Sequence, residues 1–143
     1  MIFHTDMKAV FRALKGEAKN LNWLISDLEC NYWPDKRLAN KVLFISGPEL
    51  SRLLDKYDDL QFIWGVFSGF PKEVNIDLSD ESKLPYADGN PDLDNKDRTP
   101  QHKDAIVEIV AWDSSETFFT TNDQKLIDLF KSTFTDAYDR RNT

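Results

Sequence analysis

Cysteine and histidine are scarce in this 143-residue chain, and their scarcity excludes several kinds of chemistry. Cys30 is the only cysteine, so an internal disulfide framework is impossible, and with two histidines it could complete a zinc site only if carboxylates joined it. The chain also lacks a G-x-S-x-G nucleophile turn, a phosphate-binding loop and a dinucleotide-binding fingerprint. The sequence therefore predicts no catalytic residue, no cofactor and no metal ligand.

Long apolar runs and an excess of positive charge are missing as well. No stretch approaches the roughly 20 apolar residues that cross a bilayer, and the first residues lack the basic and apolar pattern of a secretory signal. The net charge is −7 and the isoelectric point is near 4.8, which makes nucleic acid and anionic membranes poor partners because like charges repel. We expect a cytoplasmic protein with a basic protein partner. The pattern leaves open whether it is a monomer or a homodimer.

What is present is enough apolar material for a core. Apolar residues make up 41% of the chain and aromatic residues 13%, which is too rich for a disordered protein. A chain of this length buries roughly two-thirds of its unfolded surface in one domain. We therefore expect residues 1–143 to form a single globular domain.

Hydrophobic periodicity predicts the order of helices and strands. The clearest helix start is at Ser46, where Pro48 stands in the first turn and Glu49 is placed for a reciprocal capping box. Thr121 has the features of a second helix cap. The predicted helices are 6–19, 48–57 and 122–138, and the predicted strands are 23–28, 41–45, 61–70, 74–78, 105–112 and 117–121.

This order predicts an α/β (α+β) sandwich with a mainly antiparallel sheet covered by about three helices. Residues 61–70 are the most apolar stretch and are expected to be a central strand buried on both faces. The alternation in residues 74–78 predicts a short edge strand. Residues 80–104 have almost no apolar periodicity and are predicted to form a long loop.

The negative charge is concentrated in and before this loop. Residues 73–97 contain eight acidic and two basic residues, a charge of −6 out of the total of −7. Within this segment, the oxygen-bearing side chains from Asp88 to Asp94 are spaced somewhat like the ligands of a calcium-binding loop. The match is poor, because Leu93 stands where the sharp turn requires glycine. A strip of one sign accelerates encounter with a partner of the opposite sign. The alternative interpretation is that the strip only keeps the protein soluble.

The candidate partner-binding residues are acidic and aromatic. The carboxylates would pair with Lys or Arg of the partner, and a loop aromatic, Tyr86 or Trp33, would be the buried anchor because it covers much area for few frozen torsions. The predicted acidic residues are Glu81, Asp88, Asp92, Asp94 and Asp97.

Two strand sequences, residues 62–68 (FIWGVFS) and 107–115 (VEIVAWDSS), carry a resemblance. With its size and acidity, the chain resembles small acidic bacterial immunity proteins of polymorphic and contact-dependent toxin systems. The resemblance implies a non-enzymatic protein that binds one toxin domain and occludes its active site. It assigns no role to any single residue.

Two other functions stay open. One is a small enzyme or ligand-binding domain with a pocket between sheet and helices and residues 80–104 as a lid. Its pocket would be lined by Asp27, Glu29, Cys30 or Glu108 together with His102. The other is a structural homodimer formed through the predicted edge strand at 74–78.

Overall fold

The computed structural model describes residues 5–14 and 16–140 and contains one antiparallel sheet of five strands. The strand order is β2-β1-β3-β4-β5. The strands are β1 (Leu21–Cys30), β2 (Leu43–Ser46), β3 (Phe62–Pro71), β4 (Val107–Trp112) and β5 (Glu116–Thr121). The α-helices are α1 (Met7–Ala13), α2 (Gly16–Lys19), α3 (Gly47–Lys56) and α4 (Gln124–Thr133), and the short 3₁₀ helices are η1 (Lys36–Ala39), η2 (Glu81–Lys83) and η3 (Pro91–Asp94). The predicted α+β class is confirmed.

Several local predictions are confirmed by their hydrogen bonds and positions. The hydroxyl of Ser46 accepts from the amide of Glu49 at 3.3 Å and caps α3, with Pro48 in the first turn. β3 is the middle strand, as expected from its apolar sequence, and eight of its ten residues pair with β1. β4 and β5 form the expected hairpin.

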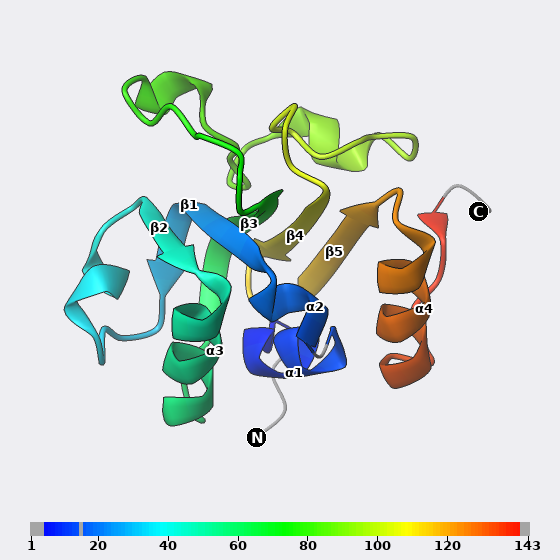
Figure 1. Ribbon diagram of the computed structural model, residues 1–143, viewed down its shortest axis with the longest axis horizontal. Helices are drawn as coiled ribbons and strands as arrows, with labels where there is room; N and C mark the ends of the chain where they lie inside the picture. The colour runs from blue at the N-terminus through cyan, green and yellow to red at the C-terminus, as the bar shows by residue number, and fades with distance from the viewer. Residues whose placement is uncertain (1–4, 15, 141–143) are drawn as a thin grey trace.

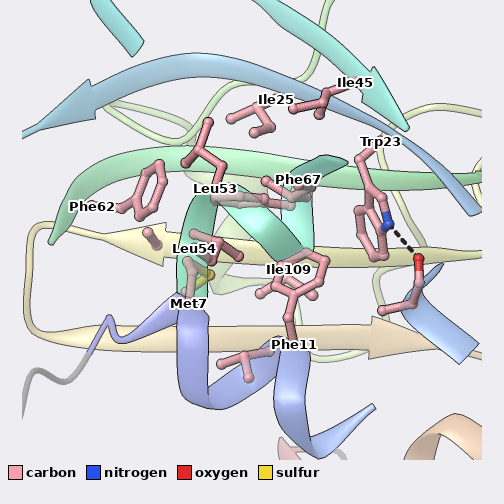
Figure 2. Packing of buried hydrophobic residues seen from close by; sticks show 14 of the residues in the cluster. Met7, Phe11, Trp23, Ile25, Ile45, Leu53, Leu54, Phe62, Phe67 and Ile109 are labelled. Carbon is pink, nitrogen blue, oxygen red and sulfur yellow. Dashed lines mark hydrogen bonds between the residues drawn. The ribbon is translucent and has the colours of Figure 1, made fainter. Parts of the chain in front are cut away.

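The α-helices pack against one face of the sheet and enclose the main core (Figure 1). Trp23 is fully buried there, packs edge to face on Phe11 with ring centroids 4.7 Å apart, and donates its indole N–H to the carbonyl of Ala18 at 2.9 Å. Figure 2 shows this hydrogen bond and the surrounding residues from α1, α3 and the strands. Burial of this many large apolar side chains is the main favourable contribution to folding.

The other face of the sheet is covered by residues 72–106, which contain no α-helix or strand (Figure 1). We call this segment the loop layer. It lies above the sheet, opposite the α-helices, and covers part of this second face. The loop predicted at 80–104 is therefore present, but it cannot act as a lid on a pocket between sheet and helices.

Three boundaries differ from the sequence-based prediction. The predicted helix 6–19 is divided into two helices: α1 ends at Ala13 with Leu14 as its C-cap, and α2 starts at Gly16, a poor helix former. The last helix is capped by Asp123, whose carboxylate accepts from the amide of Lys125 at 2.9 Å, and it ends at Thr133. The expected cap, Thr121, is the last residue of β5; its hydroxyl donates to the carbonyl of Ile106 at 2.7 Å and accepts from the amide of Asp123 at 3.1 Å.

The strand predicted at residues 74–78 is wrong, and with it the sheet edge on which the homodimer alternative depended. This segment has no ladder partner. Val74 and Ile76 instead pack as half-buried residues against Leu24, Phe70 and Leu84 under the loop layer. The sheet edges are β2 and β5.

A bulge in β1 directs the consecutive side chains of Ser26 and Asp27 toward the loop layer. Asp27 has a left-handed backbone (φ 52°), and the register with β3 shifts between Ser26 and Glu29. Such a bulge inserts an extra residue, so the alternation of side chains changes phase. Trp23 and Ile25 point to the helices before it, and Leu28 and Cys30 point to the helices after it.

Among the described residues, every helix is too short or too polar to span a bilayer.

Candidate functional site

Four of the predicted acidic residues lie on the outer surface of the loop layer. Asp88, Asp92, Asp94 and Asp97 are all exposed. None of the four forms an ion pair with a described residue. The side chain of Glu81, the fifth predicted residue, lies outside the described part of the chain. Four solvated carboxylates within ten residues therefore have no internal countercharge in the described structure.

Tyr86 and Trp33, the two predicted anchors, are in different places. Tyr86 is 45% exposed and belongs to the loop layer, next to Asp88 in the chain. Trp33 is 66% exposed in the segment between β1 and η1. This segment is bound to the helix side, where Tyr57 donates its hydroxyl to the carbonyl of Pro34 at 3.3 Å. The structure brings Tyr86, and not Trp33, together with the acidic strip.

The loop layer is held by the two side chains that the β1 bulge presents. One oxygen of Asp27, Oδ2, accepts from the amides of Ala87 and Asp88, both at 2.9 Å. Ser26 donates its hydroxyl to the carbonyl of Pro85 at 2.7 Å. All three hydrogen bonds connect positions about sixty residues apart. The two bonds to the Asp27 carboxylate are charge-assisted and therefore stronger than bonds between neutral groups, and the bond from Ser26 is buried. They fix the backbone on either side of Tyr86.

Gln101 holds the same turn from the other end of the loop layer. Its Oε1 accepts from the amide of Tyr86 at 3.0 Å and from the side chain of Asn90 at 3.1 Å. Its amide group donates to the carbonyl of Tyr86 at 3.1 Å. Asn90 also caps η3, accepting from the amide of Asp92 at 3.0 Å. The position of Tyr86 and Asp92 is thus set by side chains distant in sequence.

A buried ion pair lies beneath the loop layer. Arg98 donates to the carboxylate of Glu108, the second residue of β4, and the side chains are 9% and 0% exposed. The other oxygen of Glu108 accepts from the amide of Gln101 at 2.8 Å. Nη2 of Arg98 and the hydroxyl of Ser68, the cross-strand neighbour of Glu108, are buried and have no partner among the described residues. A charged pair enclosed in this way is costly to break, because either ion alone would stay buried.

Apolar contacts complete the attachment of the loop layer. Ala87 and Leu93 are buried against Val66 and Val110, with Trp64, Trp112 and Phe118 packed at the margin. From the chain beyond α4, Arg140 donates to the carbonyl of Leu93 at 2.7 Å and lies 5.0 Å over the ring of Phe118. The acidic strip is therefore carried by an ordered layer with its own apolar contacts.

The residues proposed for an enzymatic pocket are not brought together. Cys30 faces the helix side, where burial raises the pKa of its thiol to about 12, so it is protonated and a poor nucleophile. Glu108 lies on the opposite face of the sheet and is occupied by Arg98 and Gln101. His102 packs edge to face on Phe70 with centroids 4.8 Å apart. Within the described residues, no three His, Cys, Asp or Glu side chains form a group that could hold a metal ion.

Two shallow hollows lie among the helices. One of about 260 Å³ is lined by Lys8, Arg12 and Asp55, and one of about 320 Å³ by Arg37, Glu49 and Arg52, among others. Arg12 lies 3.4 Å from Asp55 and Arg37 lies 3.3 Å from Glu49. Each hollow is thus lined by charged side chains of which two form an ion pair, and among their described lining residues neither hollow holds a cysteine or a histidine.

Sequence reasoning missed how the loop layer is positioned, because it considered Asp27 and Glu108 only as possible lining residues of an enzymatic pocket. Asp27, Gln101 and the Arg98–Glu108 pair act over long sequence separations. One signal was present in the sequence, since Glu108 is a charged residue in the middle of an apolar strand and such a residue is buried only with a partner. Comparison of the chain with protein-family models, with curated proteins and with solved structures found no match, so the site is interpreted from its own geometry.

Proposed function

We propose that this protein is a non-enzymatic binding module of the immunity type, which acts in the cytoplasm by binding a basic toxin domain and covering its active site. The carboxylates of Asp88, Asp92, Asp94 and Asp97 attract the partner, and Tyr86 is the anchor at the centre of the contact. Trp33 is not part of this surface, because its segment is bound to the helix side.

The observation that carries the proposal is the combination of free carboxylates with an ordered support. Exposed acids on a mobile loop would have to lose conformational freedom on binding, which weakens association. Here the turn that carries Tyr86 and Asp88 is held by Asp27 and Gln101. Pre-organisation of this kind favours affinity, while the one-signed charge favours a fast association rate.

The test is a pair of double variants with the same change in net charge. D92N/D94N removes two carboxylates from the acidic strip, and D128N/D136N removes two exposed carboxylates that have no ion pair with a described residue, one in α4 and one in the segment after it. The partner used is the product of the neighbouring gene, co-expressed with this protein and then purified for association kinetics at several salt concentrations. We expect D92N/D94N to slow association about tenfold at low salt and to flatten its salt dependence.

The control variant is expected to change the association rate less than twofold. Equal effects of the two variants would show that only the net charge matters and would reject the acidic strip as the docking surface. If the wild-type protein neither binds that gene product nor protects cells that express it, the immunity interpretation is wrong.

A further inference from the structure

A row of four side chains crosses the sheet on the face that carries the loop layer. Glu29 of β1 is the register partner of Trp64 of β3, and Trp112 of β4 is the register partner of Glu116 of β5. The two indoles are in contact, with ring centroids 5.8 Å apart and an edge-to-face angle of 83°. The order across the sheet is therefore carboxylate, indole, indole, carboxylate. The row spans four adjacent strands, which is three strand spacings or roughly 14 Å.

All four side chains are on the same face. Trp64 and Trp112 pack beside Leu93 of the loop layer. Glu29 lies between Leu28 and Cys30, which point to the helices, so alternation directs it to the loop layer side. Glu116 is two residues before Phe118, which packs with Trp112. The β1 bulge is what makes this possible, because without the phase change Glu29 would face the helix core.

The row is accessible and its charges are free. Glu29 and Glu116 are exposed, and neither carboxylate has an ion pair or hydrogen bond with a described residue. Trp64 and Trp112 are half-buried, so part of each indole remains open. The electron-rich face of an indole attracts cations, and a carboxylate beside it adds a charged acceptor for the same group.

The protein already seats one guanidinium on this face. Arg140 lies 5.0 Å over Phe118, a neighbour of Trp112 in the same apolar cluster. Its position shows that a guanidinium can lie over an aromatic ring beside the loop layer.

We propose that Glu29, Trp64, Trp112 and Glu116 form a seat for a cationic side chain, and specifically for an arginine of the protein partner. Arginine fits better than lysine because its planar guanidinium stacks on an indole while its edge still donates to a carboxylate. The seat rests on the proposed function in one respect, namely that the partner is a basic protein. The seat differs from the acidic strip in what it recognises. The seat binds one side chain by direct contact, whereas the strip attracts a charged surface at long range.

The test uses the indole N–H signals of the four tryptophans in two-dimensional NMR spectra. The probe is a blocked Gly-Arg-Gly peptide, and the control is the same peptide with citrulline, which has the same shape without the charge. We expect saturable shifts of the Trp64 and Trp112 signals with the arginine peptide only. The W64F and W112F variants assign these signals.

The other two tryptophans are internal controls. Trp23 is fully buried and hydrogen-bonded, so its signal reports whether each variant is folded. Trp33 is 66% exposed on the helix side, so its signal reports non-specific attraction of a cation to any indole. A shift of Trp33 equal to that of Trp64 and Trp112 would overturn the seat, as would equal shifts with the citrulline peptide.

The E29Q/E116Q variant separates the seat from the acidic strip. We expect it to weaken binding of the arginine peptide roughly fivefold, while D92N/D94N weakens it less than twofold. If D92N/D94N has the larger effect, the peptide is attracted by the strip and the seat is rejected. Loss of toxin binding in E29Q/E116Q with normal peptide binding would also reject it, whereas failure of the toxin experiment alone would leave the peptide result standing.

Discussion

Arg98 and Glu108 form an ion pair enclosed between the loop layer and the sheet, whereas Asp88, Asp92, Asp94 and Asp97 on the outer surface of that layer are open to solvent. The carboxylate of Glu108 also accepts from the amide of Gln101. This pair attaches the loop layer to the start of β4.

Replacing one partner of this pair should destabilise the protein strongly. In E108A the guanidinium of Arg98 would stay buried without its countercharge, and we expect a loss of about 3–5 kcal/mol in the free energy of unfolding. The double variant R98M/E108L removes both charges and should lose less than E108A. Urea denaturation measures both values, and an E108A variant within about 1 kcal/mol of wild type would contradict the enclosed pair.

Asp27 is expected to control the order of the turn that carries Tyr86. D27A removes an acceptor of two amide hydrogen bonds and places alanine at φ 52°, so we expect a loss of about 3 kcal/mol. D27N keeps a side-chain oxygen and tolerates the left-handed backbone, so it should lose only about 1 kcal/mol. Hydrogen exchange of the Ala87 and Asp88 amides should accelerate most in D27A. Unchanged exchange there would show that the turn is held without Asp27.

Gly47 is expected to tolerate no side chain. A Cβ at this position would lie 2.5 Å from the carbonyl oxygen of Ala18 and 2.7 Å from that of Leu21, and both are backbone atoms that cannot move aside. We expect G47A to lose at least about 2 kcal/mol, as for overpacking of a core. The matched control is G16A, whose Cβ would meet nothing within 4 Å, so its thermal unfolding temperature should stay the same or rise. Equal effects of the two variants would contradict the close approach of α3 to the end of α2.

Tyr32 is expected to ionise later than an ordinary tyrosine. Its hydroxyl donates to the carboxylate of Asp59, and this hydrogen bond raises the pKa of Tyr32 from 10.0 to about 12. Because the folded pKa is the higher one, the contribution to stability is complete below pH 10 and is lost as the pH rises from 10 to 12. The stability difference between wild type and Y32F should therefore disappear over that range. Ultraviolet absorbance measures the formation of tyrosinate as the pH rises. The assignment is wrong if Y32F removes a transition near pH 10 and leaves the transition at the highest pH in place.

The elements predicted correctly are those specified by neighbouring residues. The Ser46 cap, the apolar sequence of β3 and the β4–β5 hairpin depend on short-range patterns that the chain displays directly. The strand expected at residues 74–78 had the right alternation, but Val74 and Ile76 bury their side chains against Leu24 and Phe70 without joining a ladder. An alternation of apolar and polar residues indicates only that one side of the segment is buried. A segment of the loop layer can be buried on one side just as a strand of a sheet can.

The candidate site was predictable only in its charge. The composition located the carboxylates from Asp88 to Asp97 and the aromatic Tyr86, because charge and loop propensity are properties of the local sequence. It did not show that the segment of Trp33 lies on the helix side, since that placement depends on the hydrogen bond from Tyr57 to the neighbouring Pro34.

What the amino-acid order settles is therefore the type of each segment and the location of the surplus negative charge. The folded chain settles which segments meet: the bulge at Asp27 turns Glu29 away from the helix core, and the sheet register sets Trp64 beside Trp112. These outcomes arise from contacts between residues tens of positions apart. Such contacts are selected by the packing of the whole domain and are not encoded in any short window of sequence.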